Sequence, residues 1–252
     1  MACLLTDVLL HKGITRVIIN KNFTDQRKPA TFKSCHQGLI ITDKNWIKAV
    51  NTVHLIEQLA ANTPGFEMDV YFDTAKNILQ VYHDSSGYSN LSIEEILNVY
   101  QAKKLTSSIW LDFKNLTTFN EKKSLSYISS LRNRYNLKNK MIIESSDPQL
   151  LQSFCDSNFY TSYYTPLFNP YLISENELIN TIDLISTNLK KYPTSAMSGY
   201  YFQYPFLQKY FPSYPLLIWA DNGNYSLVGN IFNNMLGKDE QLKVILRPAM
   251  HN

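Results

Sequence analysis

The chain has 252 residues, of which 44% are apolar and 18% charged, a composition that excludes a disordered polypeptide. A single domain of this length buries roughly 70–75% of the surface of its unfolded chain, so it needs neither disulfides nor a metal to hold its core. The formal net charge of +3 is small and the basic residues are scattered, which argues against a nucleic-acid partner.

Glycine is scarce, with 8 residues, and neither GxGxxG nor GxxxxGK[ST] phosphate-binding loops occur. The serine-hydrolase elbow, GxSxG, is absent too. No run of 18 apolar residues predicts a transmembrane helix, and the first ten residues lack the basic start of a signal peptide. We expect either a cytoplasmic protein or a processed form of an exported one.

The three cysteines, Cys3, Cys35 and Cys155, cannot all pair with each other, and no CxxC spacing indicates a zinc ribbon or a thioredoxin-type motif. We interpret them as buried or idle thiols. The odd number mildly favours a reducing compartment.

Residues 1–45 do not share the regular pattern of the rest of the chain, and we interpret them as an extension outside the main domain, 46–252. Within this extension, Arg16–Ile19 and Leu39–Thr42 predict a two-stranded cap at the bottom of the domain.

From residue 46 onward, β-rich runs alternate with helical segments, which is typical of βαβ units around a parallel sheet. The predicted strands are Trp46–Val50, Gly65–Tyr71, Ser108–Lys114, Lys140–Ser145, Phe159–Tyr164, Ser195–Tyr201, Leu216–Asp221 and Leu242–Pro248. The predicted helices are Thr52–Ala61, Ser92–Lys103, Asn120–Tyr135, Pro148–Asp156, Glu175–Lys191, Pro205–Tyr210 and Tyr225–Leu236.

Eight such units predict an α/β fold with a single (β/α)₈ TIM barrel. A doubly wound open sheet is the alternative. One further run, Asn77–Tyr82, follows the second strand after a turn and predicts a hairpin excursion. Ser92 with Glu95 forms the capping-box sequence of a helix start, and Asp147-Pro148 is typical of another helix start.

Charged side chains gather at the predicted C-terminal strand ends, where such barrels place their reactive groups. Glu67 and Asp69 are two residues apart on one strand and share a face, as do Asp112 and Lys114 on the next. Carboxylates in one barrel mouth repel each other unless a cation neutralises them. Glu67, Asp69 and Asp112 therefore predict a site for one divalent cation, Mg²⁺ or Ca²⁺, with Lys114 facing a phosphate oxygen. The alternatives are an exposed Glu67–Asp69 face and a plain Asp112–Lys114 ion pair.

His83 ends the hairpin excursion and is expected to return to the mouth, where it would serve as a general acid for a leaving alkoxide. A structural role in a turn is the alternative. Glu144 and Arg247 end the fourth and eighth strands and are candidates for substrate contact.

Aromatic residues cluster at or just beyond the last strands and predict a surface that stacks a sugar or holds a quaternary ammonium. They are Tyr163, Tyr164, Tyr200, Tyr201, Tyr204 and Trp219. We select Tyr163 and Trp219 as substrate-binding candidates. The alternative is that these rings fill the barrel and its helix interfaces.

The order of these motifs carries a family resemblance. Phe66-Glu67-Met68-Asp69-Val70, then Val81-Tyr82-His83-Asp84, then Trp110-Leu111-Asp112-Phe113-Lys114 resemble the glycerophosphodiester phosphodiesterase and phospholipase C-like superfamily. The D-x-K form also resembles the sphingomyelinase D branch. Trp46-Ile47-Lys48-Ala49-Val50-Asn51-Thr52 and Leu111-Asp112-Phe113-Lys114 are most similar to the menorin family and its bacterial relatives.

The resemblance implies a histidine at the end of the first strand that acts as base or nucleophile, and this chain has Lys48 there. Asn51 matches the family's asparagine, and we count it among the substrate-binding candidates. An inward Lys48 is expected within a few ångströms of Glu67 or Asp69, where it would compete with a divalent ion. The alternative is that Lys48 extends to solvent.

The resemblance implies a metal-dependent phosphodiester hydrolase, weakened because Lys48 replaces the first histidine, with His83, Lys48 and Lys114 as catalytic residues. The expected substrate is a small phosphodiester, a lysolipid or a glycan-linked phosphate, and the expected oligomeric state is a monomer. Two alternatives stay open: an inactive barrel that binds phosphorylated lipid or glycan ligands, and a non-enzymatic interaction protein.

Overall fold

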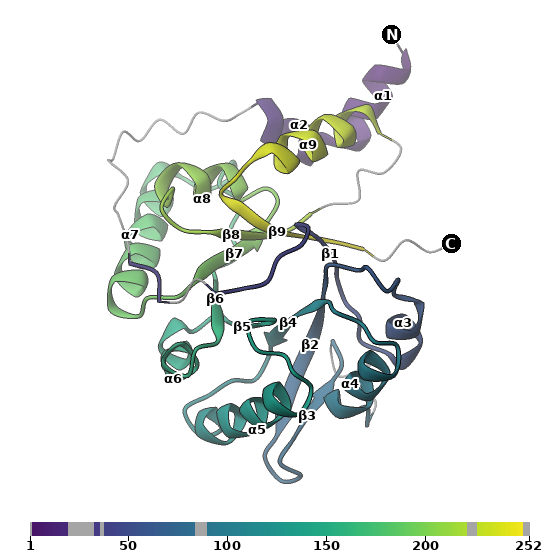
Figure 1. Ribbon diagram of the computed structural model, residues 1–252. Helices are drawn as coiled ribbons and strands as arrows, with labels where there is room; N and C mark the ends of the chain where they lie inside the picture. The colour runs from purple at the N-terminus through teal and green to yellow at the C-terminus, as the bar shows by residue number, and fades with distance from the viewer. Residues whose placement is uncertain (1, 20–32, 36–37, 84–89, 221–225, 249–252) are drawn as a thin grey trace.

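A computed structural model describes residues 2–19, 33–35, 38–83, 90–220 and 226–248, with side chains from residue 5 onward. Eight parallel strands form a closed barrel, because β1 pairs with both β2 and β9 and so joins the two ends of the sheet (Figure 1). The barrel strands are β1 (Asn45–Ile47), β2 (Gly65–Asp73), β4 (Ser108–Phe113), β5 (Met141–Ser145), β6 (Tyr160–Tyr164), β7 (Ala196–Tyr200), β8 (Leu216–Trp219) and β9 (Leu242–Arg247). The predicted (β/α)₈ barrel is confirmed, and the open sheet is excluded.

Helices cover the outside of the barrel and begin within two residues of the predicted starts, and the predicted helix Pro148–Asp156 is divided into a 3₁₀ helix and an α-helix. They are α3 (Val53–Gln58), α4 (Ile93–Ala102), α5 (Glu121–Arg134), η2 (Pro148–Leu151), α6 (Gln152–Asp156), α7 (Glu175–Lys191), α8 (Tyr204–Tyr210) and α9 (Leu227–Lys238). The capping box of Ser92 and Glu95 forms at the start of α4. Asp147 caps η2, whose first residue is Pro148. No helix within the described ranges is long and apolar enough to cross a membrane.

The excursion after β2 is the predicted hairpin. Strand β3 (Ile78–Val81) runs antiparallel to the end of β2, with Val81 opposite Val70 and Ile78 opposite Asp73. Asn77 starts the return with a φ of 53°, a left-handed conformation that asparagine tolerates better than most residues. The hairpin therefore brings the chain back toward the C-terminal ends of the strands.

The barrel interior is apolar at its N-terminal end, referred to below as the bottom. The tryptophans Trp46 and Trp110 are fully buried there, with Ile142, Tyr160, Ala196, Leu217, Val244 and Leu246. Gly65 lies against the Trp46 ring so closely that a Cβ at this position would come within 2.2 Å of it. Only glycine fits, and the close approach lets β1 and β2 meet to close the barrel.

The predicted two-stranded cap is wrong. Arg16–Ile19 lies in a helix, α2 (Lys12–Ile19), which follows α1 (Ala2–Leu10), and both helices contact α9. The reason is packing: Ile14 and Val17 are three residues apart, share one helical face and are fully buried, which outweighs the β-propensity of the branched side chains. Leu39–Thr42 forms no strand either; Leu39 and Ile41 pack against the apolar bottom of the barrel.

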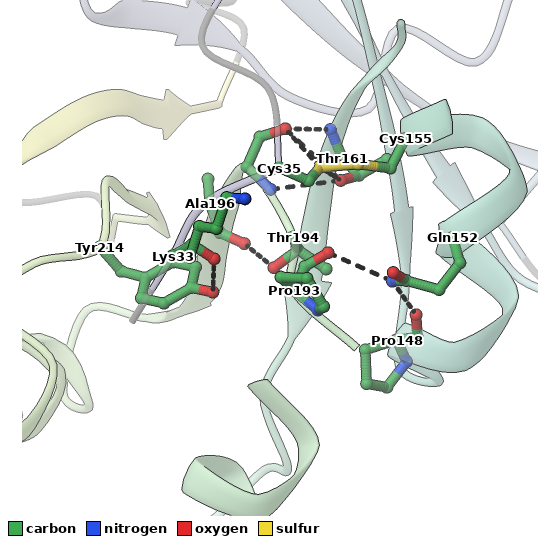
Figure 2. The surroundings of a disulfide bond; sticks show 11 residues. Lys33, Cys35, Pro148, Gln152, Cys155, Thr161, Pro193, Thr194, Ala196 and Tyr214 are labelled. Carbon is green, nitrogen blue, oxygen red and sulfur yellow. Dashed lines mark hydrogen bonds between the residues drawn. A yellow bond between two sulfur atoms is a disulfide. The ribbon is translucent and has the colours of Figure 1, made fainter. Parts of the chain in front are cut away.

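Cys35 and Cys155 form a disulfide across a sequence separation of 120 residues (Figure 2). The expectation of idle thiols is therefore wrong for these two, since spacing alone does not reveal which cysteines meet in space. The backbone N–H of Cys35 also donates to the carbonyl of Thr194, N···O 3.2 Å. The bridge and this hydrogen bond fix the chain before β1 to α6 and to the bottom of β7.

We predict that Cys35→Ser lowers the melting temperature by roughly 5–15 °C, because the bridge restricts the unfolded chain over a long loop. Cys155→Ser removes the same bridge and is expected to lower the melting temperature by a similar amount, and the double variant should melt like the single ones. Thermal denaturation with and without a reductant measures both. Alkylation that finds three free thiols in the native protein would contradict the bridge.

Candidate active site

Three carboxylates meet at the C-terminal end of the barrel. Glu67 and Asp69 point inward from β2, and Asp112 points inward from β4 directly opposite Asp69 in the parallel register. All three are less than 10% exposed, and one carboxylate oxygen from each lies within 4.8 Å of the others. The sequence prediction that these acids converge agrees with this geometry.

Hydrogen bonds from the β1–α3 loop orient two of the acids. The backbone N–H of Ala49 donates to Glu67 Oε2, N···O 2.7 Å. Ala49 has a φ of 58°, a left-handed conformation that is uncommon for a residue with a Cβ and is often found at functional sites. The Asn51 side chain donates from Nδ2 to Asp69 Oδ2 at 2.5 Å and accepts at Oδ1 from the Asp69 backbone N–H at 2.9 Å. Asn51 therefore positions Asp69 rather than facing a substrate.

Lys114 supplies positive charge to the cluster. Its Nζ lies 2.8 Å from Asp69 Oδ1 and also pairs with Asp112 Oδ2. Lys48 lines the same cavity but forms no ion pair with any described residue. Lys48 thus shares the cavity with Glu67 and Asp69, and its expected competition with a divalent ion stays a prediction. Lys114 forms the ion pair with Asp112 and a second one with Asp69. The geometric reason is that Lys114 shares a strand face with Asp112 and reaches both acids.

The cluster carries more negative charge than Lys114 balances. Burial raises the pKa of Glu67 to about 8, and the charges of Asp69 and Asp112 add to this rise. Burial also raises the pKa of Asp112, although Lys114 opposes the shift. Burial lowers the pKa of Lys114, but the Asp112 and Asp69 carboxylates outweigh it and the pKa is raised. Without a further cation, Glu67 therefore keeps its proton at neutral pH while Lys114 stays charged.

A cavity of about 160 Å³ opens above the acids. Its lining is Lys48, Ala49, Glu67, Asp69, His83, Asp112, Lys114, Tyr164, Tyr200 and Trp219. The hairpin thus places His83 at the mouth beside the acids, as the sequence predicts for its position. The cavity is far smaller than the ~300–1,000 Å³ of pockets that enclose a drug-sized ligand. It can enclose only a small part of a larger molecule.

Aromatic rings form the wall opposite the acids. Trp219 lies 5.0 Å from Tyr164 and 5.5 Å from Tyr200 between ring centroids. Trp219, a substrate-binding candidate from the sequence, lines the cavity at the end of β8. Tyr163 is corrected: it is buried against α7, and its Oη accepts a hydrogen bond from Asn188. Since neighbouring strand residues face opposite sides, Tyr164 faces the cavity in its place.

Two further candidates lie outside the cavity. Glu144 is fully buried inside the barrel opposite Asp112 in the register, where Ser198 Oγ donates to its Oε2. Burial raises the pKa of Glu144 well above its usual range, and Asp112 adds to this. Arg247 is held by Asn45 Oδ1 at 2.8 Å and Asn233 Oδ1 at 2.7 Å. The expected substrate contacts of Glu144 and Arg247 are therefore corrected.

Sequence reasoning missed the backbone N–H of Ala49, because no residue-type signal marks a backbone donor. It also missed Ser198, the partner of Glu144. Glu144 lies on β5 and Ser198 on β7, with β6 between them, so their hydrogen bond crosses the barrel interior and is not visible from either segment alone.

No protein-family model matches the chain, and no curated protein matches it in sequence. Solved structures do match in fold. A glycerophosphodiester phosphodiesterase from Parabacteroides distasonis aligns with a TM-score of 0.55 and 15% identity, over 81% of this chain and 92% of that one. A putative glycerophosphodiester phosphodiesterase from Galdieria sulphuraria aligns with a TM-score of 0.53 and 11% identity, over 82% of this chain and 94% of that one.

The chain shares the barrel fold of glycerophosphodiester phosphodiesterases. A phosphodiesterase from Oleispira antarctica in complex with the product sn-glycerol-3-phosphate has the same fold, with a TM-score of 0.51 and 9% identity over 81% of this chain and 92% of that one. At these identities the likeness concerns the fold alone. The closer resemblance to menorin stays a prediction.

We predict that Lys114→Met lowers the free energy of unfolding of the chelated protein by about 1–3 kcal/mol, because two buried carboxylates lose their counter-charge. This is below the usual loss for buried pairs, since the Lys114 side chain is 25% exposed. Adding Ca²⁺ or Mg²⁺ should restore most of the loss. Lys48→Met is the matched control and should change stability by less than about 0.5 kcal/mol. Urea denaturation with and without metal measures each value, and equal effects of the two variants would contradict the assignment of Lys114.

Proposed function

We propose that this chain is a metal-dependent phosphodiester hydrolase of the glycerophosphodiester phosphodiesterase type. The observation that carries the proposal is one cavity at the C-terminal end of the barrel that gathers Glu67, Asp69 and Asp112 with Lys114 and His83. Reactive groups of (β/α)₈ enzymes lie at this end of the fold. The shared fold of the solved phosphodiesterases supports the same reaction class.

The donor set fits a hard divalent cation. Three carboxylates offer oxygen ligands, which Mg²⁺ and Ca²⁺ prefer, and their crowding in a buried site leaves negative charge that Lys114 alone does not balance. Glu67, Asp69 and Asp112 would hold the ion. When bound, the ion would supply Lewis-acid polarisation of a phosphoryl oxygen.

The remaining residues divide the work of binding and proton transfer. Once the acids are neutralised, the Lys114 ammonium is free to contact a phosphoryl oxygen as a point charge. As water or a hydroxyl of the substrate attacks the phosphorus and gives up its proton to solvent, the P–O bond to the alcohol breaks, and His83, which lines the cavity, protonates the oxygen of the leaving alcohol. The Asn51 side chain holds Asp69 in place and the Ala49 N–H holds Glu67, so Asn51 and Ala49 act as positioning groups. The Trp219 wall packs against the part of the substrate nearest the phosphate.

Lys48 favours a second candidate function, an inactive barrel that binds phosphorylated lipids or glycans. It stands where the resembling family has a histidine, it lines the cavity, and it forms no ion pair within the described part of the chain. An ammonium in this position can bind a phosphate oxygen. In this second function the chain would bind the same class of phosphorylated ligand, but it would lack one member of the acid–base pair that hydrolysis needs.

The disulfide supports an oxidising compartment for this protein. Disulfides persist in oxidising compartments and are rare in the cytosol, and Cys35 is bonded to Cys155. We expect the protein to act there as a monomer on a small phosphodiester, a lysolipid or a glycan-linked phosphate.

A screen of phosphodiesters tests the proposed function. Bis(p-nitrophenyl) phosphate, glycerophosphocholine and lysophosphatidylcholine are offered with Mg²⁺ or Ca²⁺ to the native protein, Asp112→Asn and Lys48→His. We expect native turnover that falls at least about 100-fold in Asp112→Asn, since a lost ligand weakens charge stabilisation. Restoring the histidine should raise turnover about 10²–10⁴-fold.

The control is His54→Gln. His54 lies on α3, away from the cavity, and is hydrogen-bonded to Gln58. It should retain native turnover. No turnover by either the native protein or Lys48→His, with metal bound, would contradict the hydrolase and favour the binding protein.

A further inference from the structure

A second cavity, of about 790 Å³, lies at the bottom of the barrel and is named the lower cavity below. Ser195, Pro215 and Leu242 line it from the starts of β7, β8 and β9. Leu39 and Ile41 line it from the chain before β1. Its volume lies within the ~300–1,000 Å³ of pockets that enclose a small molecule. The lower cavity therefore has room for a whole ligand, which the cavity above the acids lacks.

The chain before β1 is fixed where it forms a wall of the lower cavity. Cys35 is bonded to Cys155 (Figure 2). The backbone N–H of Ile40 donates to the carbonyl of Asn139, N···O 2.7 Å, and the carbonyl of Ile40 accepts from Ser108 Oγ, O···O 2.6 Å. These bonds tie the wall to α6 and to the bottom of the barrel on both sides of Leu39. The wall is thus held in place before any ligand arrives.

Tyr160 brings a free hydroxyl group to the lower cavity. The residue is only 4% exposed, and its ring packs with Trp46 and Trp110 in the apolar bottom of the barrel. It lines the lower cavity, and its Oη forms no hydrogen bond with any described residue. A buried hydroxyl without a protein partner costs free energy unless a group from outside the chain completes its hydrogen bond. Tyr160 therefore marks the point where a ligand oxygen would be held.

The charged side chains of the lining balance each other. They are two lysines, Lys44 and Lys243, and two acids, Asp43 and Glu240. Lys44 Nζ donates to two backbone carbonyls at the end of α9, at 3.0 and 2.9 Å. Lys243 Nζ donates to the carbonyl of Glu240 at 2.8 Å. Since the charges cancel and both ammonium groups are engaged, the lining favours a neutral ligand over a phosphate or a cation.

The rest of the lining is largely apolar. Leu39, Ile41 and Pro215 contribute aliphatic surface, as does Leu242. An apolar pocket with one free polar group binds the apolar body of a ligand and fixes its orientation through that group. The ligand that matches is a neutral molecule with an apolar body and one oxygen that can hydrogen-bond to Tyr160.

We propose that the lower cavity is a second binding site, which takes a small neutral molecule whose hydroxyl or carbonyl oxygen hydrogen-bonds to Tyr160. The site is separate from the acids. Tyr160 begins β6, whereas Tyr164, at the other end of this strand, lines the cavity above the acids. The inference does not rest on the proposed function, because it holds whether or not the chain cleaves phosphodiesters.

Fluorescence titration with prodan, a neutral naphthalene ketone, tests the site. The native protein should bind the probe saturably and shift its emission to the blue. Tyr160→Phe keeps the ring and removes the hydroxyl, so it should weaken binding about 2–10-fold, the worth of one hydrogen bond. Ser213→Trp changes an exposed residue of the lining and should weaken binding at least about tenfold, because the added ring occupies the space of the probe.

Two control variants should bind prodan like the native protein. Tyr192→Phe is the matched control, since Tyr192 Oη donates to Gln149 Oε1 at 2.9 Å outside the lower cavity. Asp112→Asn changes the cavity above the acids. Thermal denaturation adds an independent readout: because the Tyr160 hydroxyl has no partner, Tyr160→Phe should melt at or above the native temperature.

Three results would overturn the proposal. The first is the absence of saturable prodan binding by the native protein. The second is equal affinity of the native protein, Tyr160→Phe and Ser213→Trp, or a loss of binding in Asp112→Asn alone, since the probe would then lie elsewhere. The third is a lower melting temperature of Tyr160→Phe, which would show that its hydroxyl serves the fold.

Discussion

The repulsion among three buried carboxylates is the constraint on which the rest of this site depends. Glu67, Asp69 and Asp112 share a space that excludes most water, and burying such charges without compensation is costly. Lys114 offsets part of that cost through its pair with Asp69 and Asp112. The raised pKa of Glu67 shows that Lys114 does not offset the whole cost of burying the three acids. A divalent cation bound by the three acids would balance this charge. The repulsion among the acids therefore bears both on the stability of the barrel mouth and on the chemistry proposed for it.

The barrel provides the rigidity that holds these charges together. Its bottom is filled by Trp46 and Trp110, and the bare backbone of Gly65 lets β1 close against β2. Closure brings the β1–α3 loop over β2, where Ala49 and Asn51 hydrogen-bond to the acids. The packing of the apolar bottom therefore fixes the strands that carry the acids. It holds the three carboxylates together at the mouth, although their mutual repulsion alone would drive them apart.

Much of the fold could be predicted because β-rich runs alternate with helical segments from residue 46 onward, which is typical of a parallel barrel. The period of two along each strand then placed Glu67 with Asp69 and Asp112 with Lys114 on common faces. With a period of two, a shift of one residue moves a side chain to the opposite face of the strand. The candidate Tyr163 therefore faces away from the cavity, and its neighbour Tyr164 faces it. The choice could not be made from sequence, since both neighbours are tyrosines.

Other features depend on contacts between distant segments and left no local signal. Val17–Ile19 is branched and apolar, which fits a strand as well as the buried face of a short helix, and only its docking on α9 decides between them. The Cys35–Cys155 bridge spans 120 residues and cannot be inferred from three cysteines. Lys48 and Lys114 both face the mouth, but which lysine meets the acids is set by the geometry of the closed barrel.

We propose that Glu67, Asp69 and Asp112 form one cation site, whose negative charge Lys114 partly balances in the metal-free protein. Anomalous diffraction from crystals soaked in Mn²⁺ locates a bound cation. We expect a single strong peak in the barrel mouth, with one oxygen from each of the three carboxylates at ~2.0–2.6 Å and Lys114 moved away from Asp69. A map without a peak at the three acids, or with Mn²⁺ bound elsewhere while Lys114 keeps its ion pairs, would contradict it.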